Sequence, residues 1–82
     1  MLVLARELAP RVRVNCVAPG VVAFPGRGRE SDPESQAVYL KRVPMGRAGT
    51  PEDAAEAVRW LALDARYTTG QVVRVDGGRW IT

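Results

Sequence analysis

Residues 12–20 read VRVNCVAPG, and residues 70–78, near the end of the chain, read GQVVRVDGG. Each stretch is a short run rich in β-branched residues that stops abruptly at a Pro-Gly or a Gly-Gly pair. Such runs predict strands that are buried on both faces, here over residues 12–18 and 71–75. The abrupt ends are the pattern expected where a buried strand stops beside a ligand.

The segment between these two strands contains a clear helix signal. Thr50 can cap the helix, Pro51 occupies its first position, and its apolar stripe continues until about Asp64. A strand, a crossover that contains a helix and a second strand form a right-handed parallel unit by default. The sequence therefore predicts an α/β fold in which the two strands are parallel.

Another helix is predicted at the start of the chain, where residues 1–9 read MLVLARELA. Leu4, Ala5 and Leu8 form its apolar stripe, and Pro10 stops its continuation. No N-cap residue precedes this stripe, so the segment is expected to be a helix that is cut off at its beginning. The predicted order is a truncated helix followed by strand, helix and strand.

Residues 21–49 form a long connection that contains four glycines and three prolines. A connection of this length is uncommon in a compact domain unless it serves as a lid or a binding loop. A short helix is predicted within it at residues 33–42, with Asp32 as the cap and Pro33 at the first helical position.

The composition excludes several classes of function. The 82 residues are 46% hydrophobic and 26% charged, and no apolar run approaches the roughly 18 residues of a membrane span. The net charge is +3, but twelve basic and nine acidic residues are interleaved, which argues against nucleic-acid binding. A single cysteine fits a reducing cytoplasm, and no metal site is expected. We therefore expect a cytoplasmic protein with no membrane or nucleic-acid partner.

Polar residues in and next to the strands are assigned structural roles. Asp76 is expected to accept hydrogen bonds from nearby backbone in a turn where Gly77 and Gly78 have positive φ. Asn15 is expected to be satisfied by neighbouring backbone groups. Cys16 is expected to point inward, and without histidine in the chain it is assigned no nucleophilic role.

Five segments in register resemble the C-terminal third of a short-chain dehydrogenase/reductase: ARELAP, VRVN, VAPG, RVPMGRAGTPEDAAEAV and TGQVVRVDGG. The resemblance implies that residues 1–82 are the C-terminal part of a single Rossmann-type domain with a doubly wound parallel sheet. It also implies that the Gly-rich dinucleotide loop and the catalytic Tyr and Lys precede Met1. The chain itself contains no Tyr followed four residues later by Lys, so no catalytic residue is assigned within it.

By this resemblance the first strand ends beside the nicotinamide of NADP or NAD, with NADPH favoured. Ligands of doubly wound sheets bind beyond the carboxyl ends of strands, and glycine lets the backbone approach a flat ring closely. Val22 would present its backbone N–H and C=O to the carboxamide. The expected cofactor-binding residues are Pro19, Gly20, Val21 and Val22. The alternative is that Pro19 and Gly20 merely end a strand.

The loop after this strand differs from the commonest family pattern at Phe24, where many members have a Thr before the Pro. An aromatic residue followed by Pro at this point resembles the sequence of bacterial pteridine reductases. The resemblance then implies that Phe24, Pro25 and Tyr39 bind the substrate, since flat heteroaromatic rings stack on aromatic side chains. The alternative is that Phe24 and Tyr39 only pack the loop against the domain.

The resemblance as a whole implies an oxidoreductase that transfers hydride between NAD(P)H and a carbonyl or pteridine-type substrate. It also implies a homo-oligomer, a dimer or tetramer, built on the helix at residues 51–64 and the strand at 71–75. Trp60, Val72 and Trp80 supply apolar surface for such an interface. The alternative function is a non-catalytic remnant of such an enzyme, or an assembly module, with no activity alone.

Overall fold

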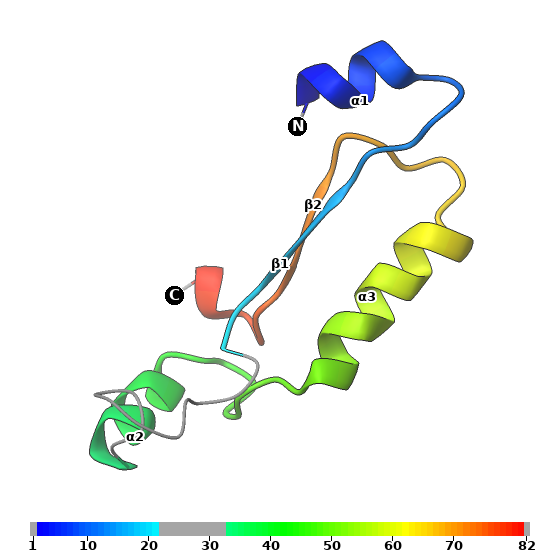
Figure 1. Cartoon of the computed structure of the whole chain (residues 1–82). Helices are drawn as coiled ribbons and strands as arrows, with labels where there is room; N and C mark the ends of the chain where they lie inside the picture. Colours follow the sequence, from blue (N-terminus) through cyan, green and yellow to red (C-terminus); the bar gives the residue numbers. More distant parts are fainter. Residues whose placement is uncertain (1, 22–32, 82) are drawn as a thin grey trace.

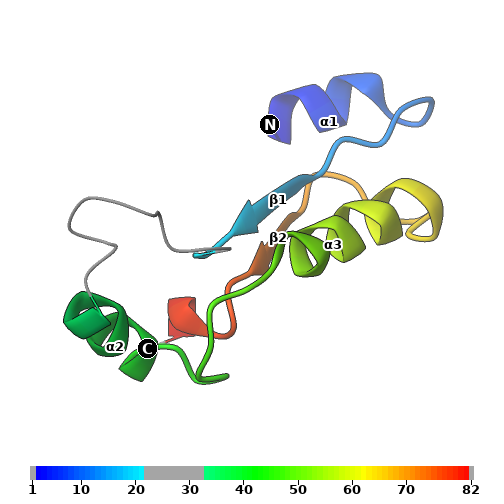
Figure 2. The same cartoon turned by 60° about the horizontal axis from the view of Figure 1, so that its bottom comes forward.

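The computed structural model describes residues 2–21 and 33–81. Their elements are α1 (Leu2–Leu8), β1 (Cys16–Pro19), α2 (Pro33–Lys41), α3 (Pro51–Leu63), β2 (Val72–Val75) and a 3-10 helix, η2 (Arg79–Ile81). The two strands lie side by side and α3 runs along them (Figure 1). Helix α1 lies near the start of the strands, and α2 lies beyond their carboxyl ends (Figure 2).

Strands β1 and β2 are parallel neighbours, in a register that pairs Cys16 with Val72 and Pro19 with Val75. The ladder extends past β1, because the Gly20 N–H donates to the Val75 carbonyl at 3.0 Å. Helix α3 connects the strands and packs against both of them. The predicted strand–helix–strand unit with parallel strands is thus confirmed.

The first strand is shorter than the sequence predicts, because residues 12–15 are not part of the ladder. Side chains replace regular pairing there: the Asn15 amide donates to the Thr68 carbonyl at 2.9 Å, and its oxygen accepts from the Gln71 N–H at 3.0 Å. The Val14 N–H donates to the Thr69 hydroxyl at 3.0 Å. The expected backbone partners of Asn15 are therefore confirmed, whereas strand structure from residue 12 is wrong.

Helix α3 is fixed at both ends. At its start, Thr50 is the cap, as predicted, and it forms a reciprocal capping box with Asp53. At its end, the guanidinium of Arg13 donates to the carbonyls of Leu61 at 2.6 Å, Ala65 at 3.0 Å and Ala62 at 3.1 Å. A cation is favoured at this end because the helix dipole is negative there and the last carbonyls have no partner within the helix.

The described residues bury little apolar surface. Ala5, Val43, Leu61 and Ala65 form the buried core. The radius of gyration is 15.5 Å, compared with about 12 Å for a compact domain of this length. Cys16 is exposed, so the expectation that it points inward is wrong: within residues 2–21 and 33–81, only α3 makes extensive contacts with the sheet.

Candidate functional site

Three segments meet at the carboxyl end of the two-stranded sheet: residues 19–21, residues 43–49 and the turn at residues 76–78. The Val21 carbonyl accepts a hydrogen bond from the Gly49 N–H at 2.8 Å, and the Gly77 carbonyl accepts one from the Met45 N–H at 3.0 Å. A Cβ atom placed on Gly20 would lie 3.0 Å from the Asp76 Cβ, so Gly20 packs directly against the turn. The backbone at the end of β1 is therefore held from two sides.

The turn after β2 has the predicted form. Gly77 and Gly78 have φ values of 63° and 92°, and the Asp76 carboxylate accepts the Gly78 N–H at 3.0 Å and the Trp80 N–H at 3.1 Å. A Cβ on Gly77 would lie 2.7 Å from the Val43 Cγ1, which leaves room for glycine alone. Asp76 is thus a structural residue of the turn, as predicted.

An open cleft of about 700 Å³ lies at this end of the sheet. It is lined by Ala18, Pro19, Gly20, Tyr39, Arg74, Asp76, Arg79 and Trp80. The structure therefore places Tyr39, a predicted substrate residue from α2, around the same cleft as the predicted cofactor residues Pro19 and Gly20. Tyr39 lines the same cleft as these two residues, about twenty positions earlier in the sequence, because α2 lies beyond the carboxyl ends of the strands (Figure 2).

A second cleft, of about 650 Å³, is lined by the end of β1, the turn after β2 and one side of α3. Val21 and Tyr39 both line it, together with Trp60 from α3. Val22, Phe24 and Pro25 lie outside the described residues. Of the seven predicted site residues, the structure thus brings Pro19, Gly20, Val21 and Tyr39 together at one end of the sheet.

The sequence did not single out an aromatic and cationic pair in the first cleft. The guanidinium carbon of Arg74 lies 4.2 Å from the centroid of the Trp80 ring, a distance at which cation and ring attract one another. Alternation along β2 places Arg74 and Val72 on one face of the strand. Nothing in the sequence indicates that Trp80, two residues after the Gly-Gly turn, folds back onto that face.

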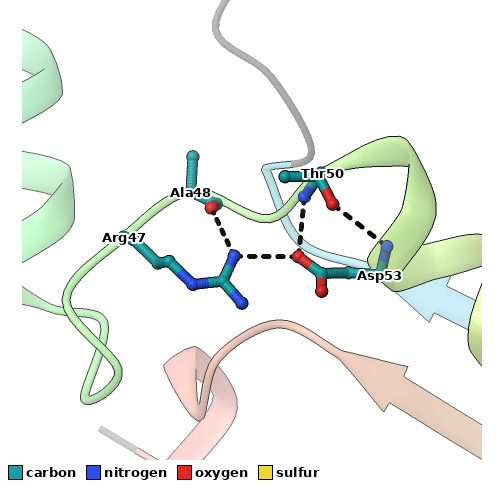
Figure 3. Close-up of polar contacts among 4 residues, drawn as sticks. All are labelled: Arg47, Ala48, Thr50 and Asp53. Atoms are coloured by element: carbon teal, nitrogen blue, oxygen red, sulfur yellow. Dashed lines mark hydrogen bonds and ion pairs between the residues drawn. The ribbon is translucent and has the colours of Figure 1, made fainter.

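The start of α3 carries a network of charged and polar groups (Figure 3). One oxygen of Asp53, Oδ2, accepts hydrogen bonds from Arg47 Nη1 and from the Thr50 N–H, both at 2.8 Å. The Thr50 hydroxyl in turn accepts the Asp53 N–H at 3.1 Å. The hydrogen bond from Arg47, followed by the one from the Thr50 backbone, lowers the pKa of Asp53 from 3.8 to about 2.

This lowered pKa predicts a dependence of stability on pH. Because the pKa of Asp53 is lower in the folded protein, its stabilising effect is full above the ordinary value of 3.8 and is lost as the pH falls toward 2. An NMR titration of the Asp53 carboxyl carbon in the folded protein should show its midpoint near 2, and Arg47→Gln should move it upward. A midpoint near 3.8 in both proteins would contradict the network.

Within residues 2–21 and 33–81, no group of three or more His, Cys, Asp or Glu side chains could hold a metal ion. No helix among these described residues has both the length and the apolar character needed to cross a membrane. The two clefts at the carboxyl end of the sheet are the candidate site for small-molecule binding.

Comparison with known proteins decides the family. A family model described as enoyl-(acyl carrier protein) reductase matches residues 1–79. A crystal structure of a short-chain dehydrogenase/reductase, glucose/ribitol dehydrogenase, from Brucella melitensis superposes on 99% of this chain with a TM-score of 0.80 and 29% sequence identity. The chain belongs to the short-chain dehydrogenase/reductase family. The recognised family and its Rossmann-type parallel fold are thereby confirmed.

Relatives of this short-chain dehydrogenase/reductase chain include enzymes with different named substrates. A 3beta-hydroxysteroid dehydrogenase from Eggerthella lenta is 47% identical over 78 residues, which are 92% of this chain and 30% of the relative. A 3-oxoacyl-(acyl-carrier-protein) reductase from Thermotoga maritima is 47% identical over 77 residues, which are 90% of this chain and 30% of the relative. The chain thus spans about a third of the length of the relatives that it matches, including 31% of the Brucella structure.

Proposed function

We propose that residues 1–82 are the C-terminal part of an oxidoreductase that transfers hydride between NAD(P)H and a carbonyl or pteridine-type substrate. The observation that carries this proposal is the meeting of Pro19, Gly20 and Tyr39 around one cleft at the carboxyl end of a parallel sheet. This is the end at which ligands of doubly wound sheets bind. A Tyr acid with its Lys would come from the rest of the enzyme.

The residues at the end of β1 fit the wall of a nicotinamide site. The Gly20 N–H and the Val21 carbonyl are both used within the protein, by Val75 and Gly49. These hydrogen bonds fix the backbone of Gly20 and Val21, and we propose that the N–H and C=O of the next residue, Val22, pair with the cofactor carboxamide. The bound cofactor supplies the hydride, and Pro19, Gly20 and Val21 shape the surface against which its ring rests.

The substrate side of the site is assigned to Phe24, Pro25 and Tyr39. The names of the two relatives describe substrates with a hydroxyl or an oxo group, which supports a carbonyl as the general class. Tyr39 and Trp80 line one cleft, and their rings would suit a planar substrate such as a pteridine. We therefore propose both classes, with the carbonyl as the broader one.

The test is oxidation of NADPH or NADH by the whole enzyme, followed by the absorbance of the reduced nicotinamide. Substrates would include an aliphatic ketone, a 3-oxoacyl thioester and dihydrobiopterin. Turnover of any of them above a buffer control supports the proposal, and the preferred dinucleotide follows from the two KM values. No turnover and no dinucleotide binding would instead favour a non-catalytic remnant or an assembly module.

Tyr39→Ala and Phe24→Ala should each lower kcat/KM for a pteridine by up to about tenfold. The loss of one ring-stacking contact costs about 1 kcal/mol in the transition state, and an aliphatic ketone should lose much less. Tyr67→Ala is the matched control, because Tyr67 is fully exposed and lines neither cleft. Equal losses of kcat/KM for both substrates would show that the two aromatic residues only pack the loop against the domain.

We also propose that the enzyme is a cytoplasmic homo-oligomer, a dimer or tetramer. Support for an oligomer comes from the exposed apolar side chains of α3 and β2, among them Trp60 and Val72. Support for a reducing compartment comes from the single cysteine, Cys16, which has no partner for an internal disulfide.

A further inference from the structure

The carbonyl of Val21 is held by a segment that precedes α3. It accepts the Gly49 N–H at 2.8 Å, while the preceding Gly20 N–H is tied to β2 through Val75 at 3.0 Å. The first contact joins the candidate cofactor wall to the start of a helix, and the second joins it to the sheet. The position of the Val21 carbonyl therefore depends on where Gly49 lies.

Both neighbours of Gly49 are held by one pair of charged side chains (Figure 3). On one side, Arg47 Nη1 donates to the Ala48 carbonyl at 3.1 Å and to Asp53 Oδ2 at 2.8 Å. On the other side, the Thr50 N–H donates to the same Oδ2 at 2.8 Å. The same carboxylate oxygen thus holds Thr50 directly and Ala48 through Arg47, so that both neighbours of Gly49 are tied to the first turn of α3.

Asp53 has the electrostatic character that such a role needs. Its hydrogen bonds are charge-assisted, and such bonds are roughly twice as strong as those between neutral groups. Its lowered pKa keeps the carboxyl ionised throughout the physiological range. The carboxylate and Arg47 are both partly exposed, at 35% and 53% of their side-chain surfaces, so the geometry of the network matters more than its Coulomb energy.

We propose that Asp53 is a positioning residue for the cofactor site, acting through Thr50 and Gly49 on the backbone of Val21. The inference rests on the proposed function, in which Val21 and Val22 form the nicotinamide wall. Asp53 touches neither cofactor nor substrate. Its carboxylate fixes the backbone of Thr50 and, through Gly49, that of Val21, and Arg47 supports it from the other side of the loop.

If the capping box served only to stabilise α3, the expected effects of its loss would differ. Loss of such a cap lowers the unfolding temperature without changing how the end of β1 is held. Arg13, at the other end of the helix, provides the comparison because its guanidinium holds three carbonyls there and contacts no residue of the Asp53 network. Arg13→Ala should therefore lower stability and leave the Gly49 contact with Val21 intact.

The experiment compares Asp53→Ala with Glu52→Ala and Arg13→Ala in the whole enzyme. Glu52→Ala removes an exposed carboxylate from the same helical turn outside the network, which controls for the helix dipole. Exchange of the Gly49 amide with deuterated water, followed by NMR, should become about tenfold faster in Asp53→Ala alone. The milder Asp53→Asn keeps an acceptor for Thr50 and should give an intermediate rate.

Kinetics give the second measurement. Asp53→Ala should raise KM for NADPH by about tenfold, with little change in KM for the carbonyl substrate. Arg47→Lys should retain a KM for NADPH closer to that of the unmodified enzyme than Arg47→Gln does. Unchanged Gly49 exchange in Asp53→Ala, or equal acceleration in Arg13→Ala, would overturn the positioning role. Faster Gly49 exchange in Asp53→Ala, in a protein that oxidises neither NADPH nor NADH, would support the action of Asp53 on the Val21 backbone and overturn the proposed function.

Discussion

The 82-residue chain on its own should oxidise no NADPH with any carbonyl or pteridine substrate. It contains no Tyr followed four residues later by Lys and no Gly-rich phosphate loop, so neither a proton donor for the carbonyl nor a pyrophosphate site is encoded within it. Its buried core consists of Ala5, Val43, Leu61 and Ala65 among the described residues, and it leaves the residues of both strands exposed or half-buried, so it is too small to stabilise the fold alone. We therefore expect no NADPH oxidation by the chain alone.

Two measurements on the purified chain check this prediction. Absorbance of the reduced nicotinamide should not decline faster than in buffer, and the near-ultraviolet circular dichroism of its two tryptophans should be weak, as in a molten state. The same assays on the whole enzyme provide the positive control. Turnover of NADPH by the chain alone would contradict the assignment of residues 1–82 as one part of a larger domain.

The strand–helix–strand unit could be predicted because its signals are local. The cap at Thr50, Pro51 at the first helical position and the Gly-Gly break after residue 75 each specify a short stretch of backbone through its own chemistry. The turn at Asp76 was predicted in detail for the same reason, since its acceptor and donors lie within four residues. The position of Pro19 and Gly20 at the strand end is also a local effect, because Pro and Gly both tend to end regular secondary structure.

The remaining features depend on contacts between residues that are distant in the sequence. Arg13 reaches carbonyls 48 to 52 residues away, and no pattern near Arg13 indicates that a helix end lies there. The start of β1 was predicted too early because Val14 and Asn15 have the residue types of a strand, yet they bond to side-chain and backbone groups of residues 68–71. The approach of Tyr39 to Pro19 likewise depends on how α2 packs.

We propose that a second subunit binds at the exposed apolar side chains of α3 and β2. Trp60 on α3 is 46% exposed and Val72 on β2 is 42% exposed, although α3 and β2 contact one another. Trp80 is 71% exposed even though its ring stacks on Arg74 of the same chain. Packing within the described residues therefore does not account for these side chains, and large exposed apolar groups of this kind mark interfaces.

Replacing both Trp60 and Val72 with Glu in the whole enzyme should convert the proposed homo-oligomer to monomers. In a two-fold interface each substitution appears on both sides, so two like charges would be buried without partners, which costs several kcal/mol per subunit pair. Light scattering at several protein concentrations measures the mass, and circular dichroism establishes that the variant remains folded. Val38→Glu, at an apolar position on α2 that is more exposed than Trp60 and Val72, is the control and should leave the mass unchanged. An unchanged oligomer in a folded Trp60→Glu, Val72→Glu variant would show that α3 and β2 face solvent or another part of the same chain.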